Sequence, residues 1–366
     1  MTEPTAASRK DDHLRLAAEQ QPGIRAARTA FDDVTVRHHA LAGISPKQVD
    51  LGVDVGPWRF PAPFYVNGMT GGTEKARALN RTLAQAAARA GVPMASGSVG
   101  IALDDPSTVE TFTVIRQENP HGIVLANIGA GRSVDDARRA VELLAADGLQ
   151  LHVNAVQETV MPEGSRDFSG WLGLIEQIAA ALDDDGVPLV VKEVGFGLSA
   201  RTLTQLRDAG VRLVDVAGTG GTDFARIEND RRDPVEDLSY LSAAAGFGLS
   251  TPAALLDAAS LPSAVRHDLT VLASGGVRHP LDVMRCLALG ARAVGVAGGF
   301  LSVALEHPDD DGATLAAVME SWREQLVALH ALFGAPSPTE FTGVDVVVTG
   351  DTADIVRAQT PSKEQM

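Results

Sequence analysis

The sequence predicts an α/β protein built as a (β/α)8 TIM barrel with N- and C-terminal extensions. From about residue 61 onward, short apolar segments alternate with amphipathic or alanine-rich helical patterns. Eight such apolar segments occur, which is the number of strands in this barrel. A chain of 366 residues with 45% hydrophobic content and 36 glycines can bury one large core and make many tight strand-to-helix turns. An open doubly wound sheet is the weaker alternative.

The eight expected strands are residues 62–67, 92–96, 122–126, 149–154, 187–193, 211–216, 269–273 and 291–296. Helical patterns lie between most of them, at residues 74–90, 134–146, 171–182 and 200–209. This order predicts a flexible tail at 1–8 and a single domain at 9–360. Within that domain we expect an N-terminal extension at 9–60, the barrel strands at 61–308 and a C-terminal helical part at 309–360.

Composition limits the partners and the compartment. The formal net charge of −16 argues against nucleic acid or an anionic membrane, so an anionic substrate needs local cations or a metal. The N-terminus has no apolar signal core and no stretch reaches about 18 apolar residues, so we expect a cytoplasmic protein. The single cysteine, Cys286, lies in a helical pattern, which indicates core packing rather than a disulfide or a metal site.

The segment 149–158 carries the clearest functional signal. Apolar residues at 149, 151 and 153 alternate with Gln150, His152 and Asn154, so a strand here has one packing face and one polar face. The polar row ends in Gln157-Glu158, where the strand should give way to a loop. Catalytic groups of this barrel sit at the C-terminal ends of its strands. The pattern therefore predicts a catalytic mouth, with a solvated strand end as the alternative.

Two further patterns suit a phosphorylated ligand. Arg9, Lys10 and His13 share one face of a helical pattern and can grip a phosphate, although a solvated helix start has the same look. The last two strands end in Gly275-Gly276 and Gly298-Gly299, at the loops where this barrel usually binds phosphate. A long segment at 217–250 follows the sixth strand, and we expect it to act as an active-site lid.

Other strand ends suit a flat heteroaromatic ring such as a flavin. They combine close glycine backbone with hydrogen-bonding side chains at 67–72, at Gly97-Ser98 and at Asn127. Lys192 at a strand end can neutralise an anionic reduced flavin, or it can simply pair with a neighbouring carboxylate.

Together these motifs resemble the FMN-dependent type 2 isopentenyl-diphosphate isomerases. The matching motifs, in order, are RKDDH (9–13), NGMTGG (67–72), HVNAVQE (152–158), MPEG (161–164), VKEVGFG (191–197), GGT (220–222), IEN (227–229) and ASGG (273–276). The resemblance implies redox-neutral allylic isomerisation of isopentenyl diphosphate to dimethylallyl diphosphate. Reduced FMN would act as acid and base, Mg²⁺ would bind the diphosphate, and NADPH would serve only to reduce the flavin. It also implies a homo-oligomer, a tetramer or an octamer.

The resemblance further implies roles for individual residues. Gln157 would be catalytic beside the allylic unit, and Glu158 would bind the magnesium, for which one carboxylate is enough. Gln157 would also share substrate binding with Arg9, Lys10, His13, His152 and Asn154. The FMN site would consist of Gly68, Met69, Thr70, Ser98, Asn127, Lys192, Thr222, Gly275, Gly276, Ala297 and Gly298.

Three departures from the family pattern leave the substrate open. Val99-Gly100 stands where the family commonly has Gln and often Arg, so a polar contact to substrate is lost. Phe247 replaces a common Trp, and Gly299 replaces a larger residue. A paralogue with a wider pocket for another prenyl diphosphate is therefore an alternative.

Two other classes stay open. An FMN oxidoreductase of the 2-hydroxy-acid oxidase type would need a base and an arginine that binds a carboxylate. The only candidates in the seventh loop are Arg278 and His279, and these are followed by Pro280, which is typical of the start of a helix. A non-catalytic flavin or phosphate binder would have no need for Gln157-Glu158 together with the N-terminal cations.

Overall fold

A computed structural model describes residues 6–232 and 237–359 and confirms the predicted barrel. Eight parallel strands close on themselves in the order β10-β11-β4-β5-β6-β7-β8-β9. The strands are β4 (Phe64–Val66), β5 (Met94–Ala95), β6 (Val124–Gly129), β7 (Gly148–Val153), β8 (Leu189–Glu193), β9 (Leu213–Asp215), β10 (Thr270–Ser274) and β11 (Val294–Val296). Each overlaps one of the eight predicted strands.

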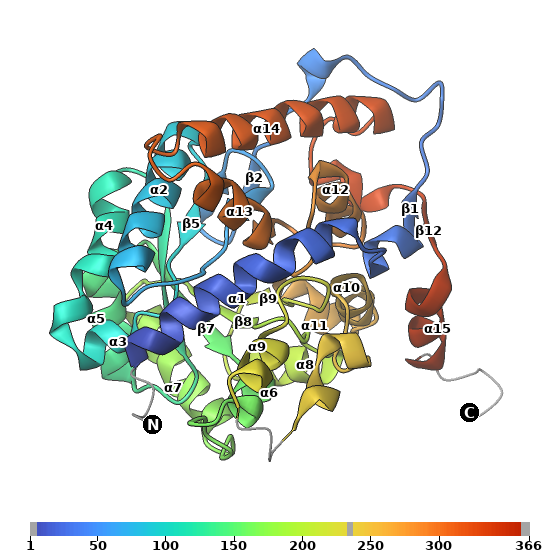
Figure 1. The fold of residues 1–366 in the computed structure, drawn as a ribbon. Helices are drawn as coiled ribbons and strands as arrows, with labels where there is room; N and C mark the ends of the chain where they lie inside the picture. Colours follow the sequence, from blue (N-terminus) through green and yellow to red (C-terminus); the bar gives the residue numbers. More distant parts are fainter. Residues whose placement is uncertain (1–5, 233–236, 360–366) are drawn as a thin grey trace.

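Helices follow the strands, and most of them cover the outside of the barrel (Figure 1), whereas α6 and α9 lie at its C-terminal mouth. They are α2 (Glu74–Ala90), α3 (Gly100–Asp104), α4 (Glu110–Glu118), α5 (Val134–Leu144), α6 (Ala155–Val160), α7 (Trp171–Asp184), α8 (Ala200–Asp208), α9 (Phe224–Asp230), α10 (Thr251–Ala259), α11 (Ser263–His267), α12 (Pro280–Ala288) and α13 (Gly298–Glu306). The four predicted helices end within two residues of α2, α5, α7 and α8 because local capping sets their ends. In α2, for example, Thr73 accepts from the Ala76 N–H, and Gly91 ends the helix in the left-handed conformation.

Strand β7 has the two faces that its alternation predicts. Leu149 and Leu151 are buried in a core cluster with residues of α5 and α7, whereas Gln150 is fully buried in the barrel interior. The residues after β7 differ from the expected loop. Asn154 is the N-cap of α6, so Gln157 and Glu158 lie on a short helix whose position is set by the end of the strand.

A hairpin closes the N-terminal end of the barrel. It consists of β2 (Val53–Val55) and β3 (Trp58–Phe60), which pair antiparallel. Its buried side chains pack against Tyr65, Leu125 and Leu213 from three barrel strands. The hairpin therefore covers this end of the barrel with apolar side chains.

The two extensions meet on the outside of the barrel. Strand β1 (Val34–Val36) pairs antiparallel with β12 (Val346–Val348), which the sequence did not predict. The C-terminal part also contains α14 (Ala313–Phe333) and α15 (Gly350–Gln359). No helix in the described part of the chain is long and apolar enough to cross a membrane.

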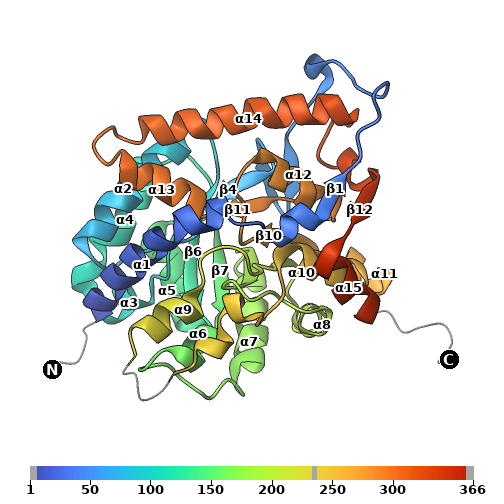
Figure 2. The ribbon, with the colours of Figure 1, turned by 45° about the vertical axis from the view of Figure 1, so that its right-hand side comes forward.

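Helix α1 (Ala6–Ala26) crosses the C-terminal mouth of the barrel and contacts α2, α9 and α13 (Figures 1 and 2). It begins three residues before Arg9, so residues 6–8 of the expected tail belong to a helix. Residues 1–5 of that tail lie outside the described residues. The position of α1 brings the predicted phosphate-gripping face over the barrel mouth.

Candidate active site

All the predicted site residues line one cavity of about 690 Å³ at the C-terminal mouth. The cavity wall combines α1, the ends of the barrel strands and the loops that follow them. This volume is within the usual range for a small-molecule or cofactor site. The roles assigned to these residues stay predictions. The fold nevertheless brings residues as distant in the sequence as Arg9 and Gly298 to the same cavity.

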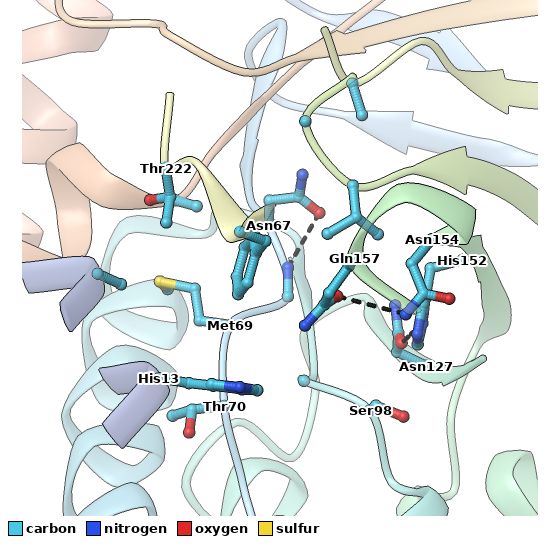
Figure 3. Close-up of a pocket in the computed structure, with 18 of the residues that line it drawn as sticks. His13, Asn67, Met69, Thr70, Ser98, Asn127, His152, Asn154, Gln157 and Thr222 are labelled. Atoms are coloured by element: carbon cyan, nitrogen blue, oxygen red, sulfur yellow. Dashed lines mark hydrogen bonds between the residues drawn. The ribbon is translucent and has the colours of Figure 1, made fainter. Parts of the chain in front are cut away.

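Asn154 organises the acidic end of the mouth. Its Nδ2 atom lies 3.3 Å from Oε1 of Gln157 and donates to Oε1 of Glu158 at 3.1 Å. The other carboxylate oxygen of Glu158 accepts from the Ser165 N–H at 3.0 Å. Gln157 and Glu158 are therefore held side by side, and both line the cavity. Figure 3 shows the contact between Asn154 and Gln157.

Glu228 on α9 is the main site residue for which the sequence predicted no role. Its side chain is fully buried, accepts from Nε2 of Gln157 at 2.8 Å and lies 2.8 Å from Nε2 of His13. Arg231 forms an ion pair with its second oxygen. Burial by itself would raise the pKa of Glu228, but the hydrogen bonds from His13 and Gln157 and the charge of Arg231 outweigh it and lower the pKa. Glu228 is thus a carboxylate that connects α1, α6 and α9.

Helix α9 lies within the segment 217–250, for which a role as an active-site lid stays a prediction. Asp223 caps α9 by accepting from the Arg226 N–H at 3.0 Å. Gln20 of α1 exchanges two hydrogen bonds with the Asp223 backbone, at 2.8 and 3.2 Å. Part of the segment is therefore an ordered helix fixed to α1, and residues 233–236 of it lie outside the described residues.

The cations of α1 supply the positive charge that the acidic chain needs at its mouth. Arg9 donates to Oε1 of Glu163 at 3.2 Å, which anchors it beside the cavity. Burial and, secondarily, the charge of Arg9 lower the pKa of Lys10 to about 8, despite the opposing effect of Glu228. A Lys10 with this pKa is protonated at neutral pH and loses its charge just above it.

We expect kcat/KM for a diphosphate substrate to fall about tenfold per pH unit above pH 8, because the cation that attracts the anion is lost as pH rises through the Lys10 pKa. The Lys10→Arg variant should keep its activity to higher pH. The measurement is kcat/KM from pH 6.5 to 10 for both proteins. Identical alkaline limbs would contradict this assignment.

His152 acts as a neutral ring. Burial, followed by the charges of Lys192 and Lys10, lowers its pKa to about 3. Its Nδ1 atom lies 2.8 Å from Oδ1 of Asn127 (Figure 3). Nδ2 of Asn127 in turn donates to Oε1 of Gln150 at 3.3 Å. This arrangement favours a proton on Nδ1, which can donate to Oδ1 of Asn127. Nε2 is then unprotonated and can accept a hydrogen bond.

Glycines bring two loops together in a cradle. A Cβ atom on Gly275 would lie 2.0 Å from the carbonyl oxygen of Gly218, and one on Gly221 would lie 2.8 Å from the Gly276 nitrogen. Gly275 and Gly276 also have positive φ angles of 95° and 75°. Nearby, α13 begins at Gly298 and presents the free N–H groups of its first turn. This backbone suits the phosphate of FMN.

Lys192 lies deep in the same cavity. Its Nζ atom donates to the Glu193 carbonyl at 2.6 Å, and burial lowers its pKa although the Asp215 and Glu193 charges oppose this. Among the described residues Lys192 forms no close side-chain ion pair, although the charges of Asp215 and Glu193 act on it. Its position fits a lysine that balances charge on a bound ring.

A magnesium site at this mouth has to rely on few protein ligands. No group of three His, Cys, Asp or Glu side chains suited to a metal occurs within 6–232 and 237–359. Mg²⁺ commonly takes one or two carboxylates and completes its shell with substrate phosphates and water. Glu158 fits such a site because it is a carboxylate that lines the cavity.

The residues proposed for an oxidase do not form a site. Arg278 pairs with Asp32 at 2.8 Å and with Asp282 at 3.0 Å, and His279 is the N-cap of α12. Neither lines the cavity.

Cys286 is buried in α12, as its helical pattern predicted, and burial raises its pKa.

The expectation that Phe247 changes the shape of the pocket is wrong. Phe247 does not line the cavity; it is 42% exposed and its ring packs edge-on against Phe196. Gly299 and Gly100 do line the cavity, so those two changes affect its shape directly.

Comparisons with known proteins agree with this geometry. An isopentenyl-diphosphate delta-isomerase of Streptomyces sp. (strain CL190) is 50% identical over 96% of this chain and 92% of its own length. This chain belongs to the isopentenyl-diphosphate isomerase family. A Moorella thermoacetica protein of the same name is 43% identical over 94% of both chains. The family model for FMN-dependent dehydrogenases matches residues 152–347, in keeping with the FMN-dependent type 2 branch.

Solved structures show the fold at lower identity. A flavocytochrome b2 variant with bound sulfite has a TM-score of 0.66 at 19% identity, covering 97% of this chain and 85% of its own. A mandelate oxidase variant has a TM-score of 0.60 at 19% identity, covering 92% of both chains. These matches support the barrel and carry no statement about the substrate.

Proposed function

We propose that this isomerase family member converts isopentenyl diphosphate to dimethylallyl diphosphate without net oxidation. The observation that carries the proposal is the pairing of Gln157 and Glu158 at one cavity that also holds the α1 cations and the glycine cradle. A redox-neutral allylic shift needs a group beside the double bond and a means of holding a diphosphate, and this mouth offers candidates for both.

The cofactors of the proposal are FMN, Mg²⁺ and NADPH as the flavin reductant. When bound, reduced FMN supplies the acid and base for proton transfer, and Mg²⁺ neutralises the diphosphate. Arg9, Lys10 and His13 bind the diphosphate from α1, and Asn154 and His152 bind it from the strand side. Glu158 holds the metal, while Gln157 orients the allylic unit.

Substitution of Gln157 should reduce turnover with little effect on substrate binding. Its amide is held by Asn154 on one side and Glu228 on the other, so Gln157→Ala removes an oriented group without removing a charge. We expect kcat to fall roughly 10²-fold while KM changes less than about threefold. Steady-state kinetics measure both values. A normal kcat in this variant would rule out a role at the allylic unit.

The experiment that tests the proposal is an anaerobic incubation of the purified protein with FMN, Mg²⁺, NADPH and isopentenyl diphosphate, followed by NMR. We expect dimethylallyl diphosphate to appear. If the flavin is bound and reduced but no product forms, the same assay with longer prenyl diphosphates tests the paralogue alternative, and failure with all of them supports a non-catalytic binder.

We further propose a cytoplasmic homo-oligomer of four or eight subunits, without nucleic-acid or membrane partners. The net charge of −16 supports the last point. Size-exclusion chromatography with light scattering measures the subunit number.

A further inference from the structure

The wall of the cavity at Val99 and Gly100 lacks a polar side chain of its own. Val99 is fully buried in a core cluster, and Gly100 begins α3 with no side chain at all. Gly100 nevertheless lines the cavity. Neither position therefore offers a side chain that could make a polar contact with a ligand.

The guanidinium of Arg132 lies beside this gap. Arg132 belongs to the loop between β6 and α5, and a Cβ atom on Gly100 would lie 3.1 Å from its NH2 atom. The same atom lies 3.5 Å from the Gly100 carbonyl oxygen. A Cβ atom at position 100 would therefore require the guanidinium to shift slightly, whereas glycine lets it lie directly against the start of α3.

The position of Arg132 along the wall indicates which part of a ligand it would meet. Arg132 and Glu158 both line the main cavity, and both also line an adjoining cavity of about 450 Å³. They thus share the wall that separates the two spaces. This wall belongs to the carboxylate end of the mouth and not to the glycine cradle.

Asp104 holds the guanidinium in a defined orientation. Its two oxygens accept from NH1 and NH2 at 2.7 and 2.5 Å, and Asp136 lies 3.8 Å from NH1. The Arg132 side chain is still 30% exposed, and Asp104 itself lines the cavity. A planar guanidinium held in this way can also bind phosphate oxygens at its remaining N–H groups.

We propose that Arg132 is a substrate-binding residue that contacts the diphosphate from the β6–α5 loop, in the space left open by Gly100. This inference rests on the proposed function and names a contact that the residues predicted from the sequence do not include. The competing explanation is a purely structural ion pair, in which Arg132 and Asp104 only fasten α3 to the β6–α5 loop.

The two explanations differ in how the KM values of two variants should compare. A purely structural ion pair predicts equal effects from the loss of either partner, whereas a binding role for Arg132 predicts unequal effects. Arg132→Gln removes the charge but keeps a planar side chain, whereas Asp104→Asn breaks the ion pair and leaves the arginine charge. If Arg132 binds diphosphate, Arg132→Gln should raise KM for isopentenyl diphosphate roughly 10- to 100-fold, whereas Asp104→Asn, which loosens the guanidinium but keeps its charge, should raise KM by about threefold at most. Arg132→Lys should recover part of the loss because it restores the charge.

A second readout does not depend on turnover. Calorimetric titration with inorganic pyrophosphate and Mg²⁺ should show clearly weaker binding for Arg132→Gln and a much smaller loss for Asp104→Asn, with FMN content unchanged in both. Arg138→Gln is the matched control, since Arg138 pairs with Asp185 at 2.7 Å on the exposed side of α5. Equal losses in the Arg132 and Asp104 variants, or unchanged pyrophosphate binding in Arg132→Gln, would overturn the proposal.

These results separate the two proposals. Pyrophosphate binding that depends on Arg132, in a wild-type protein that isomerises no prenyl diphosphate, supports the contact and contradicts the reaction. Isomerisation that is indifferent to Arg132→Gln supports the reaction and contradicts the contact.

Discussion

Replacing Glu158 with glutamine should reduce turnover roughly 10²- to 10³-fold and raise the Mg²⁺ concentration needed for half-maximal rate. The variant keeps the size of the side chain but removes the negative charge facing the cavity, and metal-based charge stabilisation is worth several kcal/mol. FMN content should be unchanged because the glycine cradle belongs to other loops. The measurement is a magnesium titration of the isomerisation rate.

Glu176→Gln is the control for this variant, since Glu176 is exposed on α7 and lines neither cavity. It should behave like the wild type. An Mg²⁺ dependence of Glu158→Gln that matches the wild type would show that Glu158 is not a metal ligand, whatever its effect on turnover.

Replacing Glu228 with alanine should cost about 3–5 kcal/mol of unfolding free energy, because it leaves a buried arginine without its main partner. The Arg231 side chain is only 7% exposed, and Glu228 is fully buried. Turnover should fall as well, because both Gln157 and His13 lose the carboxylate that holds them. Urea unfolding monitored by circular dichroism measures the first effect, and steady-state kinetics measure the second.

Glu163→Ala provides the comparison. Glu163 also contacts Arg231, at 3.1 Å, but its side chain is 37% exposed, so its loss should cost at most about 1 kcal/mol. If the two variants unfold at the same urea concentration, the claim that Glu228 is the centre of the network is wrong.

The barrel could be predicted because its signals are local. Each strand is a short apolar run followed by a turn, and one face of β7 is polar at alternate positions, so the register of Gln150 and His152 follows from the pleat. The site could be located for the same reason, since topology brings strand ends such as Asn127 and Lys192 to one mouth.

The contacts between distant segments could not be predicted in this way. Nothing local in α9 indicates that Glu228 meets His13 and Gln157, because α1 reaches it only through the docking of the N-terminal extension. The pairing of β1 with β12 and the position of Arg132 beside Gly100 likewise depend on packing between segments far apart in the sequence. Phe247 illustrates a related difficulty. It departs from the family pattern within the segment 217–250, yet its side chain does not line the cavity.

The central claim is that the reaction at this mouth is redox-neutral, and the most direct test measures product and reductant together. In one anaerobic reaction with FMN and Mg²⁺, dimethylallyl diphosphate is quantified by NMR and NADPH consumption by absorbance. We expect many molecules of product for each NADPH oxidised, since the reductant is needed only to prepare the flavin. One NADPH consumed for each substrate converted, or an oxidised product, would contradict the account.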